Sequence, residues 1–132
     1  MTVRLLLARL TTGPAAAPWW RRLTLLMILA VLYLALSPSP PRQMDTGWDK
    51  SNHALAFASL MVAGFFGYAS SRARLAGLWL ALLALGAGIE IAQTYVPNRS
   101  GEWQDLLADA LGLALGWLLA QGLSWGLRRP PM

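Results

Sequence analysis

Residues 75–95 read LAGLWLALLALGAGIEIAQTY, an apolar run whose only charged residue is Glu90. An α-helix of roughly 20 apolar residues crosses the hydrocarbon core of a bilayer, so this run is long enough for a transmembrane helix. Three more apolar runs occupy residues 23–36, 53–68 and 106–127. The pattern predicts an all-α fold, a polytopic membrane helix bundle with four transmembrane helices.

Short polar or helix-breaking segments separate the four runs. Residues 37–41 read SPSPP, and proline cannot continue a helix because it lacks the backbone donor. Residues 70–74 form a polar turn, and residues 97–104 separate the last two runs. The first run is short, but the WWRR segment at residues 19–22 lengthens it with side chains that reach the membrane interface. A signal peptide is the alternative for this run alone.

The composition favours a membrane protein over a soluble one. The chain has 132 residues, of which 56% are hydrophobic and 13% are charged, whereas soluble domains carry roughly 25% charge. A soluble chain of this length could not bury so much apolar surface. The net charge of +5 does not indicate nucleic acid as a partner, because the basic residues flank the apolar runs. The absence of cysteine excludes disulfides and thiolate chemistry.

The basic residues predict the orientation. Four spans place both termini and the 70–74 turn on one side, which carries eight arginines and no acid. These are Arg4, Arg9, Arg21, Arg22, Arg72, Arg74, Arg128 and Arg129. The other side carries Arg42, Lys50 and Arg99. The positive-inside rule therefore predicts that both termini are cytoplasmic. We expect a cytoplasmic leader at residues 1–20, lying on the membrane surface or disordered, and a transmembrane domain at residues 21–129.

All six acids fall at the opposite, non-cytoplasmic end. Residues three or four apart share a helix face, which groups Asp49, Lys50 and His53, then Glu90 with Gln93, and Asp105 with Asp109. An ionisable group in hydrocarbon is costly, so it turns into the bundle and finds a partner. We expect Arg99 to be the partner of Glu90. The predicted binding cluster is Asp49, Lys50, His53, Glu90, Gln93, Arg99, Asp105 and Asp109.

Other interpretations of these residues stay open. His53 is interpreted as a hydrogen-bonded interfacial histidine, so we expect no metal and no cofactor; a hard-cation or zinc site with the nearby carboxylates is the alternative. Asp105 by itself could serve only as a helix cap. Small residues recur every four positions in the last two runs, which predicts contact between those helices, with a homodimer as the second interpretation. They are Ala84, Gly88 and Ala92, then Ala108, Gly112, Gly116 and Ala120.

The polar motifs together resemble the VanZ-like family of small bacterial membrane proteins. The resemblance runs from about residue 48 to residue 123 and rests on DKSNH at 49–53, EIAQ at 90–93, PNR at 97–99 and DLLADALG at 105–112. It implies a multi-pass protein of the bacterial cytoplasmic (inner) membrane, with an envelope role linked to glycopeptide (teicoplanin) resistance. One departure is Asp109, where the family commonly has asparagine, so this chain has an additional acid.

Three functions fit the cluster. The first is binding or shielding of a lipid head group, a lipid-linked cell-wall precursor or an amphiphilic glycopeptide, with Arg99 and Lys50 contacting phosphate or carboxylate. The second is an intramembrane enzyme that modifies an envelope lipid, with His53 or Glu90 as the acid or base. The third is a transporter or proton relay, which the lack of acids on the inner half disfavours. We prefer the first, with membrane lipids as partners, and the sequence leaves catalysis open.

Overall fold

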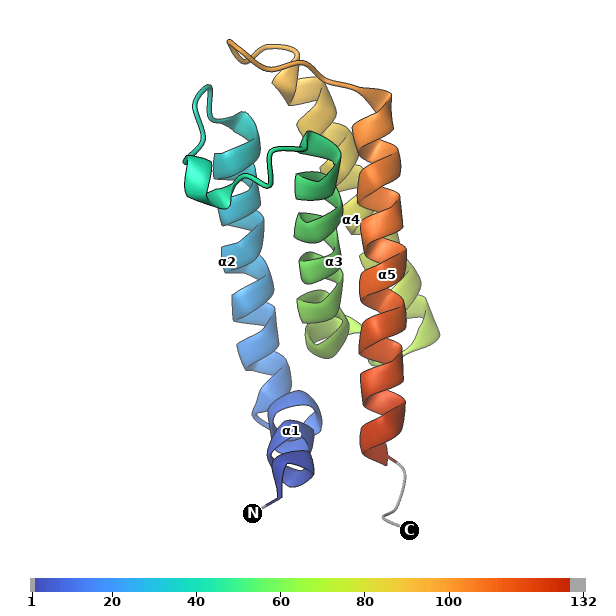
Figure 1. Cartoon of the computed structure of the whole chain (residues 1–132). Helices are drawn as coiled ribbons and strands as arrows, with labels where there is room; N and C mark the ends of the chain where they lie inside the picture. Colours follow the sequence, from blue (N-terminus) through green and yellow to red (C-terminus); the bar gives the residue numbers. More distant parts are fainter. Residues whose placement is uncertain (1, 129–132) are drawn as a thin grey trace.

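The computed structural model describes residues 2–128 and is helical, with no strand in that range (Figure 1). The all-α prediction is therefore confirmed. The helices are α1 (Val3–Thr12), α2 (Ala16–Leu36), the 3-10 helix η1 (Arg42–Met44), α3 (Asp49–Tyr68), α4 (Arg72–Gln93) and α5 (Trp103–Arg128). Arg129, which was counted in the charge prediction, lies outside the described residues.

Helices α2 to α5 run up and down beside one another, and α3 contacts the other three (Figure 1). Helix α1 and the C-terminal end of α5 lie at one end of the bundle, which we call the terminal end, together with the 69–71 turn. Segments 37–48 and 94–102 lie at the opposite end, which we call the loop end. Ser71 starts α4 by accepting a hydrogen bond from the backbone N–H of Arg74 at 3.1 Å.

Three helices, and not four, are long and apolar enough to cross a membrane: α2, α4 and α5. The predicted span at residues 53–68 lies on α3, so the prediction of four spans is wrong by this criterion. The reason is that α3 begins with the polar residues DKSNH, which lower its mean hydropathy. These polar turns are accommodated because α3 packs against three neighbouring helices.

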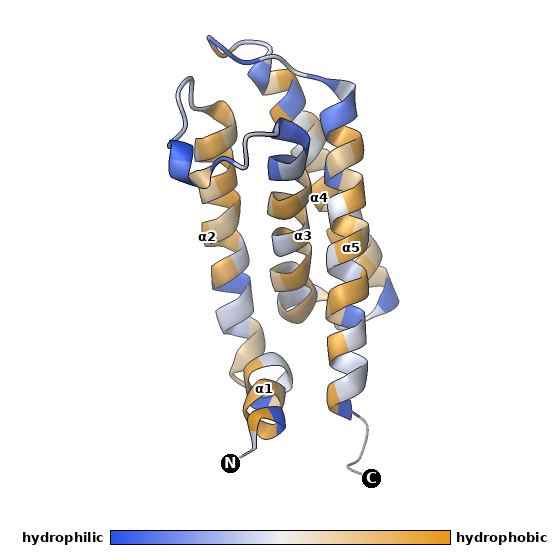
Figure 2. Cartoon of the chain, viewed as in Figure 1, coloured by the Kyte–Doolittle hydropathy of each residue, from blue (hydrophilic) through white to orange (hydrophobic). Residues whose placement is uncertain are grey.

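Apolar side chains of three helices form the core. Phe57, Leu60 and Met61 of α3 pack with Leu82 of α4 and Leu113 of α5, and all five are almost fully buried. Apolar residues also run along most of α2 and α5, which are largely orange in Figure 2, and many of them are exposed. Exposed apolar side chains there include Leu25, Leu26, Leu29, Leu111, Leu115 and Leu118. A contiguous apolar surface of this kind suits lipid and not water.

The small residues of α5 pack against α3 and not against α4. A side-chain carbon built on Gly112 or Gly116 would overlap the backbone carbonyl oxygens of Ala54 and Ala58 on α3. On α4, Gly88 is exposed and faces open space. Helices α4 and α5 do contact each other, as predicted, but the predicted pairing of Gly112 and Gly116 with the stripe around Gly88 is wrong. The backbone of α5 approaches that of α3 closely at these two glycines. The homodimer stays a prediction.

The leader forms a helix that is attached to the bundle. Arg4 donates a hydrogen bond to the carbonyl of Gly126 in α5 at 3.3 Å, and the indole of Trp20 donates to the carbonyl of Leu10 at 2.7 Å. Helix α2 begins at Ala16, so the first apolar helix extends further towards the N-terminus than residues 23–36. The predicted attachment of the leader to the membrane surface stays a prediction.

Candidate functional site

Hydrophilic residues gather at the loop end, where α3 begins, α4 ends and α5 begins, as the blue ribbon segments in Figure 2 show. Asp49 lies in the first turn of α3, and Asp105 lies in the first turn of α5. The backbone N–H groups at a helix N-terminus favour negative charge, so these two positions suit carboxylates. Up-and-down packing then brings the two N-termini next to the C-terminal part of α4, which carries Glu90.

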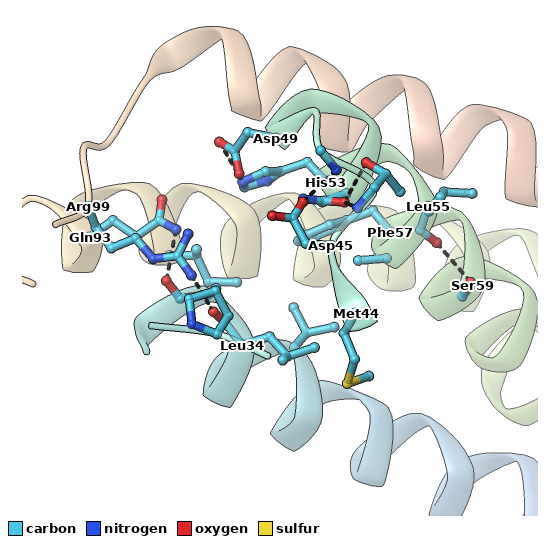
Figure 3. Close-up of a pocket in the computed structure, with 18 residues that line it drawn as sticks. Leu34, Met44, Asp45, Asp49, His53, Leu55, Phe57, Ser59, Gln93 and Arg99 are labelled. Carbon is cyan, nitrogen blue, oxygen red and sulfur yellow. Dashed lines mark hydrogen bonds and ion pairs between the residues drawn. The ribbon is translucent and has the colours of Figure 1, made fainter. Parts of the chain in front are cut away.

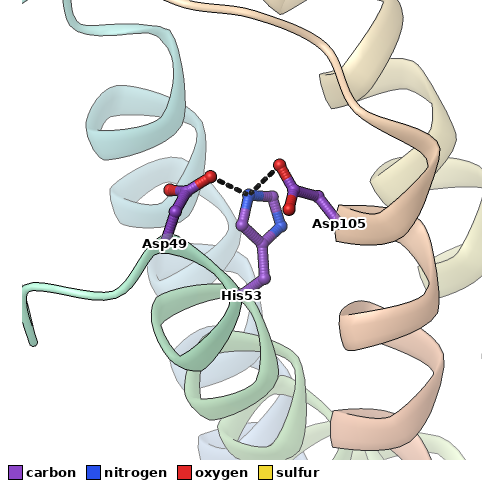
Figure 4. Close-up of side chains that lie close together, drawn as sticks. All are labelled: Asp49, His53 and Asp105. Carbon is purple, nitrogen blue, oxygen red and sulfur yellow. Dashed lines mark ion pairs between the residues drawn. The ribbon is translucent and has the colours of Figure 1, made fainter.

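His53 lies at the centre of four carboxylates. Its Nδ1 is 2.8 Å from Oδ1 of Asp109 and 3.7 Å from Oε1 of Glu90. Its Nε2 is 3.9 Å from Oδ2 of Asp49 and 3.8 Å from Oδ2 of Asp105 (Figure 4). The imidazole is 8% exposed, and the side chains of Asp105 and Asp109 are fully buried. The structure therefore brings together acids from three helices around one histidine.

Lys50 supplies the positive charge nearest to this cluster. Its Nζ lies 3.1 Å from Oε2 of Glu102 and 3.1 Å from Oδ1 of Asp105. Hydrogen bonds to these two carboxylates raise the pKa of Lys50, so the ammonium stays charged. Acidic side chains therefore outnumber basic ones at the loop end: a single ammonium and a single imidazole lie among Asp49, Glu90, Glu102, Asp105 and Asp109.

Glu90 anchors the segment that joins α4 to α5. Its Oε2 accepts a hydrogen bond from the backbone N–H of Glu102 at 2.8 Å. Gly101 lies against the backbone of Glu90, and a side-chain carbon there would overlap the carbonyl oxygen of that residue. The carboxylate of Glu90 therefore holds the loop onto the end of α4, while its other oxygen faces His53.

Arg99 and Gln93 contact the end of α2 instead of the carboxylates. Arg99 donates from Nε to the carbonyl of Ser37 at 2.9 Å and from Nη2 to the carbonyl of Leu34 at 2.7 Å. Gln93 donates from Nε2 to the carbonyl of Ala35 at 2.9 Å. The last carbonyls of a helix lack intrahelical partners, and the prolines that follow α2 supply no donors. The expected pairing of Arg99 with Glu90 is therefore wrong, because the guanidinium donates its hydrogen bonds to carbonyls at the end of α2.

A cavity of about 480 Å³ lies between α2 and α3 (Figure 3). At the loop end it is lined by polar side chains, namely Asp45, Thr46, Asp49, Asn52, His53, Gln93 and Arg99. Towards the middle of the helices it is lined mainly by apolar side chains, among them Val31, Ala56, Phe57 and Ile89, together with Ser59, whose hydroxyl donates to the carbonyl of Leu55. The cavity thus has a polar end and an apolar body.

The linker before α3 contributes residues to this cavity that the sequence patterns did not single out. Asn52 donates from Nδ2 to Oδ1 of Asp45 at 2.7 Å, and its Oδ1 accepts from the backbone N–H of Thr46 at 2.9 Å. The hydrogen bond from Asn52 lowers the pKa of Asp45 and keeps it ionised. Gly47 takes a positive φ of 83°, which allows the turn into α3. The TGWD motif at residues 46–49 was the available signal for this turn.

The eight predicted residues thus form two groups. Around His53 lie Asp49, Lys50, Glu90, Asp105 and Asp109, whereas Gln93 and Arg99 contact α2 on the other side of the cavity. The protein-family model described as VanZ/LLP1 matches residues 5–124. No curated protein and no solved structure is significantly similar to the chain. Because the family match extends from α1 to the last turns of α5, the chain belongs to the VanZ/LLP1 family and is a helical membrane protein.

Proposed function

We propose that the protein binds an amphiphilic envelope molecule in the cavity between α2 and α3: a membrane lipid, a lipid-linked cell-wall precursor or an amphiphilic glycopeptide. The observation that carries this proposal is the division of the cavity into a polar end and an apolar body. Ligand sites are typically apolar pockets with a few placed polar groups. A head group would occupy the polar end, and an acyl or prenyl chain would extend along Val31, Ala56 and Phe57.

The polar end suits a head group of mixed chemistry. The guanidinium of Arg99 lines the cavity and can contact a phosphate or carboxylate. Asp45 and Asp49 line the same end and can accept hydrogen bonds from an ammonium or from sugar hydroxyls. Lys50 has a different role from the one expected, because it binds Glu102 and Asp105 outside the cavity lining. The preferred ligand thus carries both an anionic group and hydrogen-bond donors.

We also propose that the loop end faces the outside of the cytoplasmic membrane. Among the described residues, the terminal end carries seven arginines and no acid. These are Arg4, Arg9, Arg21, Arg22, Arg72, Arg74 and Arg128. The positive-inside rule places such an end in the cytoplasm. The cavity would then meet the outer leaflet, where wall precursors and glycopeptides are found.

One observation favours an intramembrane enzyme as the second candidate. His53 lines the cavity, and Asp109 holds its Nδ1 at 2.8 Å, as a carboxylate orients the imidazole of a general base. The hydrogen bonds of residues 2–128 place no hydroxyl on His53. Water would therefore be the nucleophile, and Nε2 of His53 would accept its proton. Asp109 and Glu90, which lie 2.8 and 3.7 Å from Nδ1, would stabilise the imidazolium that forms.

Filling the cavity tests the binding proposal. Val31→Trp adds an indole to the apolar body, and Leu29→Trp adds the same group to the exposed face of the same helix. Native mass spectrometry of the purified proteins then counts the co-purified lipid. We expect the wild-type protein and the Leu29 variant to retain the lipid. The Val31 variant should carry at least about fivefold less lipid, while its melting temperature stays unchanged. Equal lipid retention in both variants, or a wild-type protein without lipid, would overturn the proposal.

Lipid and wall-precursor profiling of a deletion strain separates binding from catalysis. If the protein only binds or shields, the deletion alters glycopeptide sensitivity without adding or removing a chemical species. If it is an enzyme, a substrate accumulates or a product disappears. Restoring the gene with His53→Gln would then leave that profile uncorrected, because glutamine cannot act as a general base at neutral pH.

A further inference from the structure

The Nε2 side of His53 faces two carboxylate oxygens without a hydrogen bond to either. The distances from Nε2 to Oδ2 of Asp49 and of Asp105 are 3.9 and 3.8 Å, too long for hydrogen bonds (Figure 4). The side chain of Asp105 is fully buried, and its Oδ2 has no hydrogen-bond partner. A buried carboxylate oxygen without a partner is costly. These three atoms therefore converge on a point where a cation would satisfy them.

The other face of the imidazole already has an orienting partner. Its Nδ1 lies 2.8 Å from Oδ1 of Asp109, so a proton on Nδ1 donates to that carboxylate. The lone pair is then on Nε2, which points between Asp49 and Asp105. Histidines that bind metals almost always donate their second ring N–H to a carboxylate or carbonyl in this way. Asp109 thus fixes the tautomer that metal binding requires.

We propose that Asp49, His53 and Asp105 bind one divalent transition-metal ion of the zinc or manganese kind. The three ligand atoms lie within 4.8 Å of one another. With two sides of 3.8 and 3.9 Å and a third of at most 4.8 Å, a common centre is roughly 2.0 to 2.5 Å from each atom, a range that includes zinc–nitrogen and zinc–oxygen bond lengths.

The donor set selects the class of ion. One imidazole nitrogen and two carboxylate oxygens suit zinc or manganese, whereas magnesium and calcium prefer oxygen ligands alone. A second group, His53 with Glu90 and Asp109, could also be considered. In that group, however, Nδ1 is already hydrogen-bonded to Asp109 and has no free lone pair for a metal, so we assign the ion to the Nε2 side.

The local charge supports a dication. Lys50 binds Oδ1 of Asp105 and leaves Oδ2 available. Four carboxyl groups surround His53, whereas Lys50 supplies one ammonium beside them, and a divalent ion would add positive charge among these acids. Because Asp49 and His53 also line the cavity, the ion is accessible from it. The site forms from protein side chains alone, so it does not depend on the proposed lipid.

The test uses the full chain in detergent, freed of metal with a chelator. Titration calorimetry with zinc chloride should give a stoichiometry of one ion per chain. Added manganese should show the electron paramagnetic resonance spectrum of a protein-bound ion. We expect zinc at about tenfold above its Kd to raise the melting temperature measurably, since an ion that binds only the folded chain stabilises it by mass action. About a hundredfold excess of magnesium should not displace it.

Two matched variants remove one carboxylate charge each. Asp49→Asn removes a ligand from a half-exposed position, and Glu102→Gln removes an acid of similar exposure that only contacts Lys50. We expect Asp49→Asn to weaken zinc binding at least about tenfold and Glu102→Gln to leave it within about twofold. Asp105→Asn should abolish binding if it folds. A wild-type chain that binds neither zinc nor manganese at about 100 μM, or equal weakening in the Asp49 and Glu102 variants, would overturn the proposal.

Discussion

Nδ1 of His53 in α3 lies 2.8 Å from Oδ1 of Asp109 in α5, and the two side chains are buried together where these helices pack. The residues are separated by 56 positions in the chain. Their pairing sets the orientation of the imidazole between four carboxylates, and so it affects binding, catalysis and the proposed metal site alike. It also joins the polar end of α3 to α5, above the close glycine contacts at Gly112 and Gly116.

The first prediction concerns this pair. Asp109→Ala leaves the buried imidazole without its partner, and we expect it to lower the free energy of unfolding by about 2 kcal/mol or more. Asp109→Asn retains an acceptor oxygen, and asparagine is the residue that the family resemblance leads us to expect here, so we expect a loss below about 1 kcal/mol. Thermal unfolding in detergent measures both. Equal stability of the two variants would show that the hydrogen bond contributes nothing.

The second prediction concerns the contact between α3 and α5. Gly112→Leu places a side chain against the carbonyl of Ala54, and we expect a destabilisation of about 1–3 kcal/mol or more from overpacking. The control is Gly122→Leu on the same helix, where a side chain meets open space. The melting midpoint in detergent should fall for the first variant only. An unchanged midpoint for Gly112→Leu would mean that the two backbones do not approach closely.

The third prediction concerns the end of α2. Arg99→Gln removes the donors to the carbonyls of Leu34 and Ser37, and we expect a loss of about 1–3 kcal/mol because those acceptors lose charged partners. Arg42→Gln removes the same charge from an exposed position in the neighbouring linker and should change stability by less than about 0.5 kcal/mol. Chemical unfolding of the two purified variants checks this. A stable Arg99 variant would mean that water replaces the guanidinium at no cost.

The fourth prediction concerns orientation. Since the basic residues gather at the terminal end, we expect a phosphatase that is active only outside the cytoplasm to be inactive when fused after Met132 and active when inserted after Gln43. A reporter that is active only in the cytoplasm should give the opposite pattern at both sites. The reverse result with both reporters would place the cavity at the inner leaflet.

Much of the site was accessible from the sequence because helical spacing groups side chains on one face. The intervals between Asp49 and His53, and between Asp105 and Asp109, predicted polar faces on two helices, and the structure brings them together around His53. The partner of Arg99 was not predicted correctly. Its contacts depend on where α2 ends in space, and no spacing within one helix encodes that position.

By itself, the sequence determined the helical class, the apolar runs and the gathering of acids at one end, because hydropathy and helical periodicity are local properties of the chain. Only the tertiary structure decided that α3 is packed among the other helices, that Gly112 contacts Ala54, and that a cavity with a polar end lies between α2 and α3. The physical reason is that these features depend on distances between side chains of different helices. Those distances are set by packing of the whole bundle, to which every helix contributes.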